Sequence, residues 1–293
     1  MTLDQLRIFL AVARNCHVTR AARELRMTQS AVSAAIRALE DQHQVQLFDR
    51  IGRGIALTEE GQTFIAAARQ VLGAAESAEG LLDDLNATPR GRLRVQASQT
   101  IGTYLLPPLL VALRSEWPSL QITLDAGNTA SVAREVAEGH ADLGFVEGEV
   151  RHDELRQQVF MRDELVLLMG ADHPLRDKAQ WDRDDYLAQT WVLREEGSGT
   201  RSEVELHLRD MGLTVADLQV ALTLPSNEAV LSSLAGGHSV TMLSARVADL
   251  TGAGVHRRHV TWTRKPERAF SVLTHPERHR SRAARALMTK LGL

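Results

Sequence analysis

The sequence has one cysteine, no long apolar run and no secretion signal, and each absence excludes a class of protein. Cys16 is the only cysteine among 293 residues, so an intrachain disulfide is impossible. No apolar run approaches the roughly 18 residues that indicate a membrane-spanning helix. The first residues, MTLDQLRIFLAV, lack the basic segment and small-residue cleavage site of a secretory leader. We therefore expect a cytoplasmic protein.

Motifs of catalysis, nucleotide binding and metal binding are also missing. The glycine-rich segment 197–199 lacks the Gly-Lys-Ser/Thr ending of a Walker loop, and no Gly-x-Ser-x-Gly elbow occurs. Cysteine and histidine residues do not have metal-ligand spacing. His256 and His259 flank two arginines, and we expect them on the surface. The sequence therefore predicts no enzyme activity, no metal and no cofactor.

Length and charge limit the remaining possibilities. At about 150 residues per domain, the chain has room for two domains. The formal net charge is −3, and residues 1–60 hold eight arginines against seven acidic residues. Any affinity for nucleic acid must therefore come from where the charges lie. Residues 256–293 hold ten basic residues against two glutamates, which favours a solvated basic helix face, with an interaction surface as the alternative.

The first forty residues predict three short helices. Apolar residues recur at helical spacing from Leu3 onward, and Thr2 with Gln5 has the form of a capping box. A second short helix follows, with its apolar face at residues 18–25. A third helix begins after an N-cap at Thr28 and directs four apolar side chains toward a core. These are Val32, Ala35, Ile36 and Leu39.

Small polar side chains on the outer face of the third helix are candidates for DNA contact. An α-helix fits the major groove only if its N-terminal end is slim and presents hydrogen-bonding groups. After the cap at Thr28, this face carries Gln29, Ser30, Ser33 and Arg37. The same spacing suits a generic three-helix core whose exposed polar residues have no function. Periodicity alone leaves both interpretations open.

A hairpin follows and favours DNA binding. The segment 47–57 holds two short apolar runs around Gly52 and Gly54, which predicts a wing. Arg50 and Arg53 lie near its tip, where guanidinium groups can reach phosphates or a minor groove. Without the preceding helices, the same arginines would be solvated loop residues.

A long helix with a heptad seam is predicted from residue 59. Thr58 is a suitable N-cap, and Glu59 and Glu60 place carboxylates where they favour the helix dipole. Apolar residues then alternate at spacings of four and three, as in a coiled coil: Phe64, Ala68, Val71, Ala75, Ala78, Leu82 and Leu85. We expect two chains to pair along this seam, with two DNA-binding units on successive major grooves. Packing against the chain's own C-terminal domain is the alternative.

Strand and helix patterns alternate after a turn-rich hinge at 86–91 and predict an α/β domain. The order β-α-β-α-β over residues 93–146 implies a parallel sheet with right-handed crossovers. Further strands are predicted at 165–169, 190–193, 220–224, 240–243 and 270–274, enough for two small sheets. In such sheets ligands bind beyond the carboxyl ends of strands, at helix N-termini.

Two loops fit a ligand site of this kind. One is 98–100, after the first strand, and the other is 195–201, which opens a helix. Glycine in the second loop permits close approach of a ligand, and its hydroxyls are donors for a small anion. The candidate ligand residues are Ser98, Thr100, Glu147, Glu195, Ser198, Gly199, Thr200 and Asn227. A carboxylate at 147 tolerates an anion only with a shared proton, a cation or a water between them, and a salt-bridged scaffold role is favoured for Glu195. A capped strand-to-helix turn without a ligand is the alternative for the second loop.

Residues 3–61 resemble the DNA-binding domain of LysR-type transcriptional regulators. The resemblance rests on LDQLRIF at 3–9, AA at 21–22, TQSAVS at 28–33, IRALE at 36–40, LFDR at 47–50 and LTEEG at 57–61. It implies a recognition helix with Gln29, Ser30, Ser33 and Arg37 and a wing with Arg50 and Arg53. The implied architecture is an all-α winged helix-turn-helix at 1–58, a linker helix and hinge at 59–90, and an effector domain at 91–293.

The C-terminal part resembles the α/β effector domain of the same family, two lobes akin to periplasmic binding proteins. Lobe I comprises about 92–161 and 266–293, and lobe II about 162–265. REEGSGTR at 194–201 resembles a subset that governs carbon-dioxide fixation and sulfur metabolism, whose effectors are often anionic, although Glu196 stands where proline is common. The resemblance implies a homodimer or homotetramer on double-stranded promoter DNA, in contact with RNA polymerase and controlled by a small anionic metabolite. The alternatives are an aromatic or amino-acid effector, or a cytoplasmic receptor or enzyme that dimerises through its N-terminus.

Overall fold

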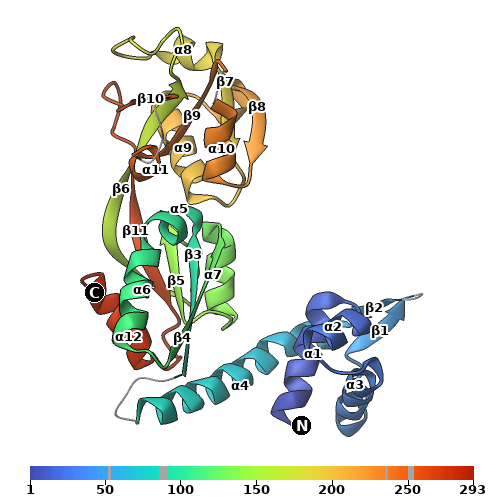
Figure 1. The fold of residues 1–293 in the computed structure, drawn as a ribbon. Coiled ribbons are helices and arrows are strands. Elements are labelled where there is room, and N and C mark those ends of the chain that lie inside the picture. The colour runs from blue at the N-terminus through green and yellow to red at the C-terminus, as the bar shows by residue number, and fades with distance from the viewer. Residues whose placement is uncertain (52–53, 86–90, 235–236, 250–253) are drawn as a thin grey trace. The chain divides into compact units, whose positions relative to one another are not determined.

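The computed structural model describes residues 1–293 except 52–53, 86–90, 235–236 and 250–253. The chain divides into two compact units, Met1–Leu85 and Asn86–Leu293, each with its own core (Figure 1). In the described parts of the chain, none of the helices is both long and apolar enough to span a bilayer.

The N-terminal unit contains the predicted helices and hairpin. Its elements are α1 (Leu3–Asn15), α2 (Val18–Glu24), α3 (Gln29–His43), β1 (Phe48–Ile51), β2 (Gly54–Leu57) and α4 (Glu59–Asp84). The caps predicted at Thr2, Thr28 and Thr58 are confirmed, whereas a cap expected at Thr19 is absent because α2 begins at Val18. Thr2 and Gln5 form a capping box, and the Thr28 hydroxyl accepts a hydrogen bond from the backbone of Ala31 at 3.2 Å. The Thr58 hydroxyl accepts one from the backbone of Gly61 at 2.9 Å and so begins α4.

One aromatic cluster joins the parts of this unit. The Phe9 ring is fully buried, 5.5 Å from the ring of Phe48 and 5.0 Å from that of Phe64. The Glu40 carboxylate accepts hydrogen bonds from the backbone N–H groups of Leu47 (2.8 Å) and Phe48 (3.1 Å). These contacts fix the hairpin and the start of α4 against α1 and α3.

The apolar residues of the seam predicted along α4 lie in two different environments in the structure. Ala68 is fully buried in the core of the N-terminal unit, and Phe64 packs against the same core. The prediction that Ala68 lies in an interchain seam is therefore wrong, because its side chain is already enclosed by its own unit. Further along, Val71, Leu82 and Leu85 are 41%, 65% and 76% exposed. Exposed apolar side chains therefore remain from the middle of α4 to just beyond its end.

A mixed sheet organises the C-terminal unit. Its strands are β3 (Gly91–Ser98), β4 (Leu120–Gly127), β5 (Leu143–Glu147), β6 (Arg156–Gly170), β7 (Thr190–Arg194), β8 (Gln219–Leu224), β9 (Ser239–Ser244), β10 (Val255–Arg258) and β11 (Glu267–Thr274). The predicted parallel pairing is confirmed, because β3 lies between β4 and β5 and is parallel to both. Strand β11 is antiparallel to β5 and to β6.

Strand β6 joins the two halves of this unit. The first half is built on β3, β4, β5 and β11, and the second on β7, β8 and β9. Residues 156–164 of β6 pair with β11, and residues 165–169 pair with β9, which is followed by β7 and β8. The ladder is therefore continuous where the sequence predicted two separate small sheets. The first half of β6 was not predicted because its sequence, RQQVFMRDE, has no apolar alternation. β10, which pairs with the end of β6, was missed as well.

Helices cover each half of the sheet and enclose separate cores. They are α5 (Gln99–Tyr104), α6 (Leu106–Glu116), α7 (Thr129–Ala137), α8 (Arg183–Ala188), α9 (Gly199–Asp210), α10 (Asn227–Leu234), α11 (Ala245–Ala248) and α12 (Arg282–Lys290), with a 3-10 turn at Val215–Asp217. The first core includes Phe145 and Phe270, and the second includes Tyr186 and Trp191. α12 buries its apolar side and leaves Arg282, Arg285 and Lys290 exposed, so a basic helix face is present there.

Candidate functional site

Polar side chains lie at the N-terminal end of α3, as the sequence predicts. Thr28, Gln29 and Ser30 are exposed, while Ser33 is half-buried one turn later. Arg37 is exposed and donates from Nε to the backbone oxygen of Ser33 at 3.3 Å. The opposite side of α3 is buried at Val32, Ile36 and Leu39. The slim polar end of this helix therefore faces outward.

The hairpin forms the predicted wing, with antiparallel pairing from Phe48–Leu57 to Ile51–Gly54. Arg50 lies in β1, but its side chain is outside the described part of the structure, and so is Arg53.

A second polar cluster lies where the two halves of the C-terminal unit meet. Its members come from the ends of different elements: Ser98 ends β3, Thr100 is in α5, Glu147 ends β5, Thr200 is in the first turn of α9 and Arg268 begins β11. Parallel strands end at a common edge, so β3 and β5 bring their last residues together with the following helix N-terminus. All five side chains are buried.

The Glu147 carboxylate is the centre of this cluster. It accepts hydrogen bonds from the Ser98 hydroxyl (2.9 Å), the Thr100 backbone N–H (3.2 Å) and the Thr200 hydroxyl (3.4 Å). It also forms a salt bridge with Arg268 Nη1. Four donors thus surround one carboxylate, and the side chain is only 3% exposed.

Arg268 compensates the buried negative charge. Its guanidinium is fully buried and donates to Asp163 at 2.9 Å as well as to Glu147, and to the Thr200 hydroxyl at 2.8 Å. The second oxygen of Asp163 accepts from the Ser244 hydroxyl at 2.7 Å. Burial raises the pKa of Asp163, and the attraction of Arg268 offsets part of that rise. A single guanidinium therefore holds two carboxylates together.

Gly199 allows the two halves to approach closely. A Cβ atom at this position would lie 2.5 Å from the backbone oxygen of Glu147 and 2.9 Å from the hydroxyl of Thr129. The predicted close approach at this glycine is present, but the group that approaches is the chain's own backbone. Ser198 is the buried N-cap residue of α9, and its side chain does not cap the helix.

Asn227 joins the cluster, whereas Glu195 does not. Asn227 Nδ2 donates to the Thr100 hydroxyl at 3.2 Å, and its Oδ1 accepts from Arg194 at 2.5 Å. Its backbone N–H donates to the side-chain oxygen of Gln99 at 2.8 Å. Glu195 pairs with Arg194 at 2.8 Å, which is the scaffold arrangement favoured from the sequence.

A further contact ties the halves together beside the cluster. The Tyr104 hydroxyl, on α5, donates to Glu228 on α10 at 2.7 Å. Burial, followed by this hydrogen bond, raises the pKa of Tyr104 well above its usual value. The phenol therefore stays protonated and remains a donor.

Four residues of this cluster were not found from the sequence. Arg268 precedes the apolar run from which the last strand was predicted, and an arginine at the start of such a strand is the one available signal. Asp163 lies within the charged run Arg162-Asp163-Glu164, which resembles a surface segment. Arg194 and Gln99 lie next to predicted ligand residues in the sequence, but no motif indicates a role for either of them.

The two units together define a class of protein: a DNA-binding regulator that carries a domain for a small molecule. Residues 3–62 match the family model described as bacterial regulatory helix-turn-helix protein, lysR family. Residues 86–292 match the model of the LysR substrate binding domain. The chain therefore belongs to the LysR family of transcriptional regulators.

Curated relatives cover most of the chain. The uncharacterised regulator YeiE of Escherichia coli is 33% identical over 98% of this chain and 96% of its own length. CysL of Bacillus subtilis is 33% identical over 84% of this chain and 82% of its own. The RuBisCO operon transcriptional regulator of Allochromatium vinosum is 32% identical, covering 85% and 82%. The resemblance to the carbon-fixation and sulfur subset is confirmed, and the receptor or enzyme alternative is excluded because these relatives are transcriptional regulators.

Solved structures share the fold. A full-length OxyR variant from Pseudomonas aeruginosa has a TM-score of 0.74 at 24% identity, covering 100% of this chain and 95% of that one. The regulatory domain of Synechocystis CcmR, solved in complex with 2-PG, has a TM-score of 0.62 at 25% identity and covers 69% of this chain and 96% of that one.

Proposed function

We propose that a small anionic metabolite controls this regulator by taking the place of the Glu147 carboxylate. The observation that carries the proposal is the set of donors around that carboxylate: two hydroxyls, one backbone N–H and the guanidinium of Arg268. Oxyanions are bound by this kind of donor set. The 2-PG complex of the CcmR regulatory domain supports a small metabolite as the effector.

Displacement of the Glu147 carboxylate by the anion is more favourable than binding of the anion beside an unmoved Glu147. Asp163 already lies beside Arg268. Glu203, on α9, is a further buried carboxyl group near this guanidinium. Burial raises the pKa of Glu203, and attraction by Arg264 and Arg268 offsets part of that rise. A further anion next to an unmoved Glu147 would therefore meet strong repulsion in a site of low dielectric. If Glu147 leaves the site, one negative charge replaces another and the donors stay satisfied.

Such an exchange offers a way to change the angle between the lobes. Ser98, Thr100 and Arg268 belong to the first half of the unit, while Thr200 and Asn227 belong to the second. An anion of different size and shape would bridge these donors differently. We expect a rearranged oligomer and altered DNA spacing or bending, with an energy limited to the differential affinity of the anion for the two states.

The proposal assigns DNA contact to the other unit. Thr28, Gln29, Ser30, Ser33 and Arg37 contact the major groove, and Arg50 and Arg53 contact phosphates or the minor groove. The exposed apolar residues Val71 and Leu82 of α4, with Leu85 just after the helix, support pairing with a second copy. We expect the protein to act at promoters in the cytoplasm, in contact with RNA polymerase.

Removing the Glu147 carboxylate tests this proposal. Glu147→Ala leaves the donors around Arg268 without their anion, so added sulfate should stabilise the variant, by about 2.7 kcal/mol at 100 times its Kd. The wild-type protein should respond much less, because sulfate must first displace Glu147. Thermal unfolding of the full chain with and without sulfate measures both.

The matched control is Glu149→Ala, which removes an exposed carboxylate two residues away. Sodium chloride at equal ionic strength controls for charge screening, and the response of Glu149→Ala controls for the general stabilisation that sulfate gives by exclusion from protein surfaces. Equal sulfate responses in Glu147→Ala and Glu149→Ala would contradict an anion site at this cluster.

A further inference from the structure

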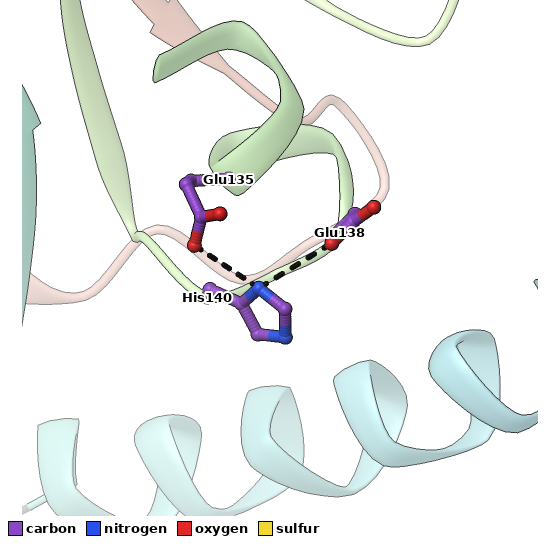
Figure 2. Close-up of side chains that lie close together, drawn as sticks. All are labelled: Glu135, Glu138 and His140. Carbon is purple, nitrogen blue, oxygen red and sulfur yellow. Dashed lines mark hydrogen bonds and ion pairs between the residues drawn. The ribbon is translucent and has the colours of Figure 1, made fainter. Parts of the chain in front are cut away.

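Three potential metal ligands converge at the C-terminal end of α7, away from the Glu147 cluster. Figure 2 shows the side chains of Glu135 and Glu138 directed toward the ring of His140. His140 Nδ1 lies 3.1 Å from Glu135 Oε2 and 3.5 Å from Glu138 Oε2. The three ligand atoms all lie within 4.8 Å of one another.

The backbone holds these side chains in place. Gly139 has a φ of +81°, a left-handed conformation that turns the chain back over the helix end. The N–H of His140 then donates to the backbone oxygen of Glu135 at 2.9 Å. Arg278, in the segment between β11 and α12, donates to the oxygens of Val136 (2.8 Å) and Ala137 (3.0 Å) and anchors the same turn. The arrangement therefore needs little reorganisation to receive an ion.

We propose that Glu135, Glu138 and His140 bind a divalent transition-metal ion, with zinc as the best fit. Zinc bonds to imidazole nitrogen and carboxylate oxygen are about 2.1 Å long, so neighbouring ligands of a tetrahedral site lie about 3.4 Å apart. The two distances from Nδ1, 3.1 and 3.5 Å, match that spacing. The imidazole nitrogen favours zinc, nickel or copper over calcium and magnesium, which take oxygen ligands.

Charge and exposure fit a bound cation with an open coordination position. Two carboxylates face one imidazole, so the acidic groups outnumber the histidine, while the Arg278 guanidinium on the last carbonyl groups of α7 offsets the helix dipole there. The side chains of Glu135, Glu138 and His140 are 30%, 20% and 36% exposed. Water can therefore complete the coordination, as in zinc sites with three protein ligands.

Cobalt and zinc titrations of the full-length protein test the site. Cobalt(II) should give the visible absorption of tetrahedral coordination at one ion per chain, and zinc should displace it. His140→Ala should weaken zinc binding by at least about tenfold and abolish the cobalt spectrum. Glu135→Gln, which keeps size and helix propensity, should also weaken binding.

His259→Ala is the matched control, because among the described residues His259 pairs with one carboxylate, that of Glu164, at 2.8 Å. It should leave both affinity and spectrum unchanged, and thermal unfolding without metal checks that each variant is folded. Equal zinc affinity in the wild type and His140→Ala, or an equal loss in His259→Ala, would overturn the proposal.

Discussion

Replacing Arg268 by methionine is expected to destabilise the C-terminal unit by about 3–5 kcal/mol, the cost of leaving buried charges without their partner. Methionine fills a similar volume, so the loss comes from Glu147 and Asp163, which are 3% and 1% exposed at the side chain. Thermal unfolding should shift by about 10 °C, at about 2–4 °C per kcal/mol for a domain of this size.

Neutralising the two carboxylates should recover part of this loss. In the triple variant Arg268→Met, Glu147→Gln, Asp163→Asn, neither of these two buried positions keeps an unpaired charge, so it should be more stable than Arg268→Met alone. The surface control is Arg257→Met, whose partner Asp249 is 61% exposed, and its effect should stay below about 1 kcal/mol. An Arg268→Met variant no less stable than Arg257→Met would mean that the buried cluster does not hold the two halves together.

The double variant Gln29→Glu, Ser30→Glu is expected to bind promoter DNA about 100-fold more weakly, a loss of about 2.7 kcal/mol. Both side chains are exposed in the first turn of α3, where carboxylates would face phosphates and base edges. Carboxylates at a helix N-terminus favour the helix dipole, so the fold should not be weakened. Fluorescence anisotropy with labelled promoter DNA at fixed salt measures the affinity.

A charge-matched control separates this effect from net charge. Gln62→Glu, Gln70→Glu adds the same two negative charges at exposed positions of α4. It should lower affinity only a few-fold, and more so at low salt. Equal losses in the two double variants would exclude α3 as the recognition helix.

The sequence predicted the elements of the N-terminal unit closely because each has a local signal. Capping residues Thr2, Thr28 and Thr58 mark three helix starts, and glycines mark the hairpin. No local signal predicted that Ala68 packs into the core of its own unit. A heptad seam and a core-facing stripe share their spacing over two turns, so only the packing of α1 against α4 distinguishes them.

The candidate site in the C-terminal unit was predicted only in part, for a physical reason. Ser98 and Glu147 end strands, and Thr100, Thr200 and Asn227 open helices, so topology alone brings these residues together. The partners of Glu147 depend on tertiary placement, since Arg268 is 121 positions further along the chain. In a sequence, a charged residue that folding buries has the same pattern as a surface residue unless its partner is known.

The most direct test of the central claim is a footprint of the full-length protein on promoter DNA with and without its anion. The anion is chosen as the one that most raises the unfolding temperature, from sulfur oxyanions, phosphorylated sugars, carboxylates and nucleotides. An anion that displaces Glu147 should change the extent or spacing of the protected region in the wild type. An identical pattern at saturating anion would contradict control of DNA binding through this site.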